Sequence, residues 1–222
     1  MDVAISNQAS HAVANQDHLA LACGIECFVD ELAHAAGQDP YAFRMRLVHL
    51  DEAQKTARLR AVLEIAAEKS DWGKALPQNH GRGIACCVFG ATYIAQVAEV
   101  SVDKGGSLRV NRVVSAVDCG LAVNPDSVRA QIEGGINYAL TPVLSGEISI
   151  KEGAVEQSNF HNYQVLRMKD APEIQVHIVP AQGNPEHGVG EAGVPPLAPA
   201  VANAIFAATG KRVRRLPMGK IA

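Results

Sequence analysis

The fold is decided by residues 93–117, Y-I-A-Q-V-A-E-V-S-V-D-K-G-G-S-L-R-V-N-R-V-V-S-A-V. Side chains over residues 93–103 alternate between two sides, which is typical of a β-strand. The sequence Lys104-Gly105-Gly106 then favours a turn. Residues 108–117 are again rich in valine and read as the partner strand. The stretch therefore predicts a β-hairpin.

Helices are expected upstream of this hairpin, over residues 21–73. The first has apolar residues at three- and four-residue spacing, namely Leu21, Ile25, Phe28, Val29, Leu32 and Ala36. Gly37 supplies its C-terminal stop, and Asp39-Pro40 supplies a cap and a first-turn proline for the second. A third helix is predicted over about residues 55–69. The expected buried positions are Phe43, Leu47 and Leu50 in the second helix and Leu59, Val62, Leu63 and Ala66 in the third.

Shorter elements are expected in the rest of the chain. Asn124-Pro125 predicts the start of a helix that runs to about Leu140. Gly134-Gly135 within it suggests close packing against a backbone or a ligand, or a kink. The other expected elements are strands over 83–89, 174–179 and 213–216, a hairpin over 146–155 and a small-residue helix over 197–209.

The predicted fold class is α+β, with a helical N-terminal third followed by mixed β-hairpins and helices. The expected divisions are an irregular leader over residues 1–20, a helical segment over 21–73 and an α+β unit over 82–222.

Composition argues against several classes of protein. The chain of 222 residues has a net charge of −3, which gives no general reason to expect nucleic-acid binding. It has no apolar run of about 18 residues, so no membrane span is predicted. No export signal is visible, and cytoplasm and periplasm both stay open. The five cysteines contain no C-x-x-C pair, which favours reduced thiols over a disulfide framework or a zinc site. The basic run 211–215 is expected to decorate a strand.

The stretch G-V-G-E-A-G-V-P-P, residues 188–196, places one carboxylate, Glu191, among three glycines and two prolines. Glycine allows close approach of a bulky group, and proline stiffens the chain that follows. Such a loop can aim an acid at a large ligand. The alternative is a surface turn before a helix, with Glu191 solvated.

Several segments, taken together and in order, resemble one family. They include F-V-D-E-L-A-H-A-A-G-Q-D-P (28–40), V-D-C-G-L-A-V-N-P-D (117–126), Q-I-E-G-G (131–135), Q-S-N-F-H-N-Y (157–163) and G-V-G-E-A-G-V-P-P-L-A-P-A-V-A-N-A (188–204). The chain resembles the C-terminal portion of the molybdenum-binding large subunit of the xanthine dehydrogenase/aldehyde oxidase family, most of all the isoquinoline 1-oxidoreductase β-subunit type. The resemblance covers nearly everything after residue 20.

The resemblance implies hydroxylation, with oxygen from water, of a carbon beside a ring nitrogen or of an aldehyde. The glutamate of the glycine-rich loop is the family's general base, and that role falls on Glu191. Gln131 matches a position that hydrogen-bonds the pterin of the cofactor, and Gly188, Val189 and Gly190 would form the neighbouring wall. No protein side chain is expected to bind the metal. His161 and His187 are weaker candidates for lining a substrate pocket.

The resemblance also implies missing parts. The N-terminal half of the large subunit, with its own cofactor-contacting loops, is not in this sequence, so residues 82–222 would be a molybdopterin-binding half-domain. The implied cofactor is molybdopterin in its cytosine dinucleotide form. The implied partners are the missing half, a [2Fe–2S] small subunit and a cytochrome c as electron acceptor. The alternative is a truncated, non-catalytic remnant or interaction domain that holds no cofactor.

Overall fold

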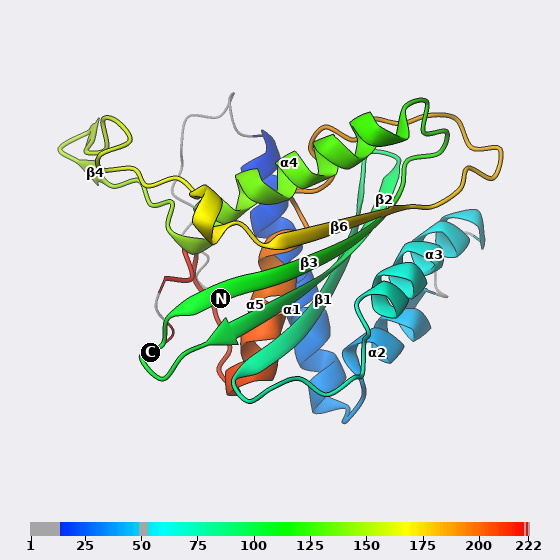
Figure 1. Ribbon diagram of the computed structural model, residues 1–222, viewed down its shortest axis with the longest axis horizontal. Coiled ribbons are helices and arrows are strands. Elements are labelled where there is room, and N and C mark those ends of the chain that lie inside the picture. Colours follow the sequence, from blue (N-terminus) through cyan, green and yellow to red (C-terminus); the bar gives the residue numbers. More distant parts are fainter. Residues whose placement is uncertain (1–13, 49–52, 220, 222) are drawn as a thin grey trace.

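A four-stranded sheet is the centre of the computed structural model, which describes residues 14–48, 53–219 and 221 (Figure 1). Strand β2 pairs antiparallel with both β1 and β3, and β6 pairs with β3 in parallel. Because β2 and β3 are the two halves of the predicted hairpin, that prediction is confirmed. The bounds are β1 (His80–Phe89), β2 (Thr92–Val102), β3 (Leu108–Asp118) and β6 (Glu173–Ile178).

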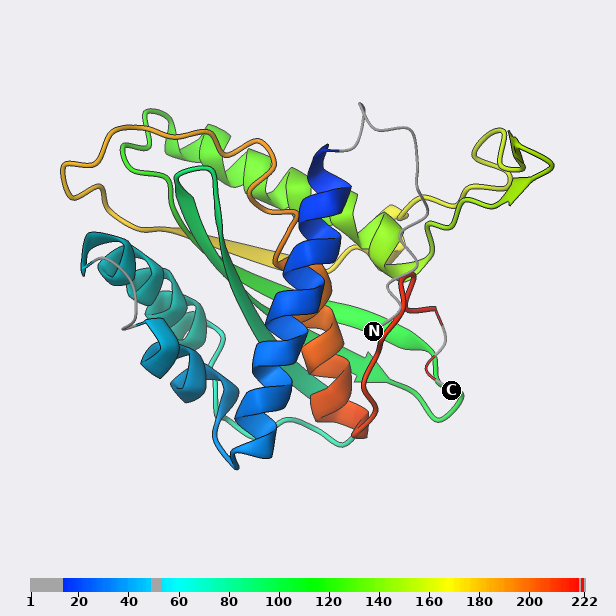
Figure 2. The same ribbon diagram turned by 180° about the vertical axis from the view of Figure 1, so that it is seen from behind.

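Helices cover both faces of the sheet, as Figures 1 and 2 show. One face carries α4 (Pro125–Leu144) and α5 (Leu197–Thr209), and α1 (Ala14–Ala35) packs on the outer side of α5. The other face carries α3 (Ala53–Lys69), with α2 (Pro40–Leu47) beside it. This mixture of helices and hairpins confirms the α+β class.

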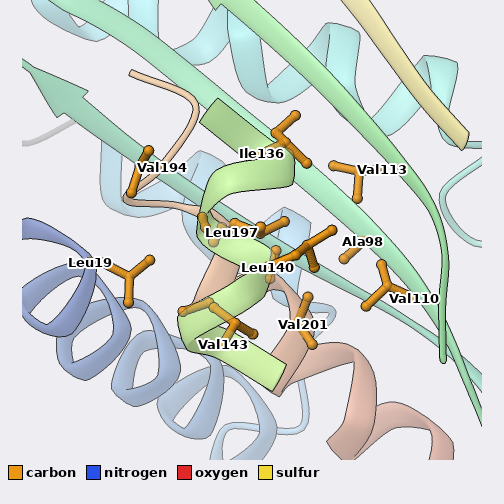
Figure 3. Close-up of a cluster of buried hydrophobic side chains, with 14 of the residues drawn as sticks. Leu19, Ala98, Val110, Val113, Ile136, Leu140, Val143, Val194, Leu197 and Val201 are labelled. Atoms are coloured by element: carbon orange, nitrogen blue, oxygen red, sulfur yellow. The ribbon is translucent and has the colours of Figure 1, made fainter. Parts of the chain in front are cut away.

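The larger hydrophobic core lies between the sheet and helices α4 and α5 (Figure 3). Ile136 and Leu140 of α4, Leu197 of α5 and Val113 of β3 have no exposed surface. Burial of a side chain of this size stabilises the fold by roughly 1.5–3 kcal/mol. Val194, at the end of the glycine-rich loop, belongs to the same cluster. The core therefore fixes both the loop's end and the start of α5.

The start of α4 agrees with the predicted cap. The side-chain oxygen of Asn124 accepts hydrogen bonds from the backbone N–H groups of Asp126 and Ser127, both at 3.1 Å. Pro125 follows in the first turn, where its missing N–H costs nothing. These local contacts set where α4 begins and, through its rigid axis, where Gln131 lies.

A short arm leaves the body after α4. It contains β4 (Ile150–Lys151) and β5 (Ala154–Val155), which pair as the predicted second hairpin, and it returns through the 3₁₀ turn η2 (Met168–Asp170). In Figure 1 the arm projects away from the sheet. None of the helices in the described ranges combines the length and the apolar character that a membrane crossing requires.

The first helix differs from the expectation in its start and its orientation. It begins at Ala14, inside the segment expected to be irregular, while residues 1–13 lie outside the described residues. Leu21, Ile25 and Phe28 are 63%, 53% and 56% exposed, whereas Glu26 is buried. Leu19 is buried on the side opposite the apolar stripe, so the buried side of the helix begins before residue 21.

The second helix also differs, because its buried side chain is Arg44 rather than Leu47. Leu47 is exposed, Phe43 is half-buried and Leu50 lies outside the described residues. The Arg44 Nε donates to Oε2 of Glu26 at 2.9 Å, and Nη2 donates to the Glu26 backbone oxygen at 2.8 Å. Since a buried charge without a partner is costly, this ion pair decides how α2 faces α1.

The predicted closing strand over residues 213–216 is wrong, because residues 211–219 form no strand. The Arg212 Nη1 donates to Oδ2 of Asp30 at 2.6 Å, and its guanidinium lies 3.4 Å from the centre of the Phe206 ring. Arg214 pairs with Glu31. The alternating basic residues therefore hold the end of the chain against α1 instead of decorating a strand.

Candidate functional site

The glycine-rich loop lies between β6 and α5 and is held by the sheet. The Thr92 hydroxyl, at the start of β2, donates to the backbone oxygen of Gly188 at 2.8 Å. The backbone N–H of His187 donates to the oxygen of Cys119 at 2.9 Å. The N–H of Val194 then donates to the oxygen of Glu191 at 2.9 Å and closes a turn. The carboxylate at residue 191 is therefore carried on an anchored turn.

The loop packs closely on α4. A Cβ placed on Gly193 would lie 2.8 Å from the backbone oxygen of Ile132, a distance that carbon cannot occupy without a shift. A Cβ on Gly135 would lie 3.4 Å from the Gly193 Cα. Backbone therefore meets backbone here, as the paired glycines of α4 suggested. Gly134 differs, since a Cβ there would meet nothing within 4 Å.

This packing brings the predicted cofactor residues to one surface. A Cβ placed on Gly190 would lie 4.0 Å from Oε1 of Gln131, so the loop and the α4 amide are neighbours. Gln131, Gly190 and Glu191 are exposed, and Val189 is half-buried. Glu191 directly follows Gly190 and so lies beside this contact, on the α4 side of the molecule.

The two candidate histidines lie in different surroundings. His187 is half-buried at the base of the loop, where its charge would help to lower the pKa of Asp118. His161 is exposed in the segment between β5 and η2, and none of its contacts among the described residues reaches the glycine-rich loop. The structure therefore brings His187, and not His161, to the candidate site.

An ion pair supports the same end of the sheet. Nε and Nη2 of Arg58 donate to the two carboxylate oxygens of Asp118, both at 2.8 Å, and the guanidinium lies 4.2 Å from the centre of the Tyr93 ring. Burial alone would raise the pKa of Asp118. The hydrogen bonds from Arg58 and from the Gly120 N–H outweigh burial and hold that pKa below its usual value.

The exposed groups of this surface fit a large polar ligand. Within the described ranges, the backbone N–H groups of residues 188–191 donate no hydrogen bond. Gln131 offers an amide that both donates and accepts, which suits the edge of a pterin. The open face of Gly134 leaves room for a planar group to approach α4. Donors, acceptor and space therefore agree with a molybdopterin.

The cysteines do not form a metal site. Sγ of Cys23 and Sγ of Cys27 lie 3.8 Å apart on α1. Burial raises the pKa of the Cys87 thiol to about 12. Among the residues that the structure describes, no group of three or more histidine, cysteine or carboxylate side chains could hold a metal ion.

Comparison with known protein families matches residues 25–172 to the molybdopterin cofactor-binding domain. The chain belongs to this family. Its relatives include the β-subunit of isoquinoline 1-oxidoreductase from Brevundimonas diminuta, which is 36% identical over 197 residues, 87% of this chain and 24% of the relative. A nicotinate dehydrogenase subunit from Pseudomonas putida is 36% identical over 216 residues, 87% of this chain and 17% of the relative. The resemblance to molybdenum-binding subunits is confirmed.

Solved structures agree on the fold. Aldehyde oxidoreductase from Desulfovibrio gigas superposes with a TM-score of 0.68 over 93% of this chain and 40% of its own, at 15% identity. Aldehyde oxidoreductase from Desulfovibrio desulfuricans is 28% identical, with a TM-score of 0.52 over 58% of this chain and 15% of its own. This chain covers about a quarter or less of the length of the two relatives from Brevundimonas diminuta and Pseudomonas putida.

Sequence reasoning missed the side chains that hold the loop. Thr92 and Gln96 bond to backbone oxygens 96 and 97 residues away, and Arg58 reaches Asp118 across 60 residues. One signal was present for Gln96, which interrupts an otherwise apolar run in a strand. A polar residue in such a run indicates either a buried partner or a functional role.

Proposed function

We propose that this chain supplies the general base and part of the molybdopterin wall of a molybdenum hydroxylase. The observation that supports this most is the meeting of the Glu191 turn with Gln131 on one exposed surface. Gln131 would hydrogen-bond the pterin, while Gly188, Val189 and Gly190 would form the adjoining wall. Glu191 would be the catalytic residue.

The cofactor, when bound, would activate a water molecule and accept the two electrons of the oxidation. The role of Glu191 would be to take up the proton of that water at a carboxylate oxygen. A metal lowers the pKa of bound water toward the range in which a carboxylate can act as base. The substrate class would be an N-heterocycle, oxidised beside its ring nitrogen, or an aldehyde.

The active assembly would need further parts. We propose the N-terminal half of the molybdenum-binding subunit, a [2Fe–2S] small subunit and a cytochrome c as electron acceptor, with the cofactor in its cytosine dinucleotide form. The relatives from Brevundimonas diminuta and Pseudomonas putida are themselves subunits, which is consistent with an assembly of several chains. Without those parts the open surface beside Glu191 would not enclose a pterin, and we expect no turnover.

The test is reconstitution. The chain is co-expressed with an N-terminal half and a [2Fe–2S] protein, and the complex is assayed for bound molybdenum and for dye reduction with an N-heterocycle. We expect Glu191→Gln to retain molybdenum and to lose activity by about 100-fold or more, as removal of a general base does. The matched control is Glu186→Gln, an exposed glutamate of the preceding segment, which should keep full activity.

Two results would count against the proposal. A complex that forms but never retains molybdenum would favour the non-catalytic interaction domain. A complex in which Glu191→Gln turns over as fast as the parent would remove Glu191 from the chemistry. Since Glu191 is exposed, the substitution itself should change the free energy of unfolding by no more than about 0.5 kcal/mol.

A further inference from the structure

Gln96 is a polar side chain in the apolar centre of β2. Its neighbours on the same face of the strand, Ile94 and Ala98, belong to the larger hydrophobic core, and Gln96 itself has no exposed surface. Burial of an amide is unfavourable unless its polar atoms find partners. The Gln96 Nε2 donates to the backbone oxygen of Gly193 at 3.0 Å. Its Oε1 is buried and has no partner among the described residues, so the bond to Gly193 is the interaction through which the amide holds the glycine-rich loop.

Gln96 and Thr92 hold the loop on both sides of Glu191. Thr92 lies four residues earlier on β2, so both side chains point to the same face of the sheet. Its hydroxyl holds the oxygen of Gly188, and Gln96 holds the oxygen of Gly193. The hydrogen bond between the Val194 N–H and the Glu191 oxygen closes the turn across the anchored Gly193. One strand thus sets the position of the whole turn.

We propose that Gln96 is a positioning residue that fixes the turn carrying Glu191 beside Gln131. This inference rests on the proposed function for the role of Glu191. How the turn is held does not depend on that function. Gln96 holds the loop through a backbone oxygen and not through the Glu191 side chain, so it would place any side chain at residue 191 in the same way. Methionine at residue 96 would fill similar space but would donate nothing to the Gly193 oxygen.

The first test measures amide hydrogen exchange by NMR in the purified chain. In Gln96→Met we expect the Val194 N–H to exchange at least about 10-fold faster, because the turn opens more often. The His187 N–H, which bonds to Cys119, is the internal control and should not change. Val110→Ala, a core substitution at the far end of β3, controls for a general loss of stability.

If Gln96→Met fails to fold, Gln96→Asn takes its place, since its amide is too short to reach Gly193 but keeps the polarity. Unchanged Val194 exchange in a folded variant of either kind would overturn the proposal. Faster exchange at His187 to the same degree would also overturn it, since the effect would then be general.

The second test uses the reconstituted enzyme. Per bound molybdenum, Gln96→Met should lower kcat by about 10-fold or more and leave KM unchanged, because a misplaced base slows proton transfer without weakening substrate binding. A variant that merely unfolds would lose molybdenum together with activity. If the complex shows no turnover at all, the proposed function fails, while the Val194 exchange result still decides the role of Gln96.

Discussion

Asp118 joins the sheet to the base of the candidate site, and its titration contributes to stability. Its pKa is held below the usual value by Arg58 and the Gly120 N–H, against the effect of burial. A carboxylate with a lowered pKa stabilises the fold above its unfolded pKa of about 3.9, and this contribution is lost as the pH falls through the folded pKa.

Asp118→Asn should therefore lower the free energy of unfolding by about 3 kcal/mol at pH 7, since it leaves the Arg58 charge without its partner. The difference from the parent should shrink below about pH 4 as the parent's own carboxylate is protonated. Urea unfolding at several pH values measures the loss of stability at pH 7 and its decrease at low pH. Glu147→Gln, which removes a pair exposed on both sides, should change stability by less than about 1 kcal/mol. A pH-independent difference for Asp118→Asn would contradict this assignment.

At the level of single residues, the sequence identifies the candidate ligand-binding groups better than the side chains that hold the loop in place. Glu191 and Gln131 lie in motifs that the resemblance identifies, and the structure places their segments side by side. Gln96 and Thr92 do not stand out, because their partners are backbone oxygens nearly a hundred residues away. A backbone oxygen has no sequence signature, so only the fold reveals such an anchor.

Gly134 of α4 and Gly193 of the loop show how glycines at one contact between segments can serve different purposes. Gly134 faces open space, whereas Gly193 of the loop lies against the α4 backbone at Ile132. Gly134→Ala should raise the free energy of unfolding by about 0.5–1 kcal/mol, because alanine favours a helix interior. Gly193→Ala should lower it, by about 1–3 kcal/mol, because the new methyl group is forced against a carbonyl. Thermal or urea unfolding compares the two.

Comparison of Gly134→Ala with the parent also separates the effect on stability from the effect on cofactor binding. In the reconstituted complex, Gly134→Ala should retain less molybdenum than the parent despite its greater stability, because its methyl group would occupy the open face of α4 on which we propose that the pterin binds. Equal molybdenum content in the two proteins would place the cofactor elsewhere on the surface.

At the level of elements, the sequence predicts best where the stabilising contacts are local. The β2–β3 hairpin and the Asn124 cap depend on neighbours within a few residues, and both are confirmed. The orientation of α1 depends on charges from distant parts of the chain. Arg44 and Arg212 draw Glu26 and Asp30 inward, across 18 and 182 residues. Periodicity identified a helix there, but it could not show which side is buried.

The whole molecule is organised as a sheet between two helical layers, and the N-terminal helices complete both hydrophobic cores. Val62 and Leu63 of α3 are fully buried in one cluster with Ile84, Val97 and Ala116 of the sheet. On the opposite face, Leu19 and Cys27 of α1 join the larger core. The division of the chain into a helical segment and an α+β unit stays a prediction, and it can be tested directly.

A chain that begins at residue 78 would keep every strand of the sheet but lose α1, α2 and α3. We expect it to show no cooperative urea transition, because one face of the sheet would expose the apolar side chains that α3 now covers. The comparison is Leu63→Ala in the full chain, which should unfold cooperatively with a loss of about 2–5 kcal/mol. A cooperative transition in the shortened chain would show instead that the α+β unit folds by itself. The helical segment would then be a separate addition to the sheet, despite its contacts with α5 and with strands β1, β2 and β3.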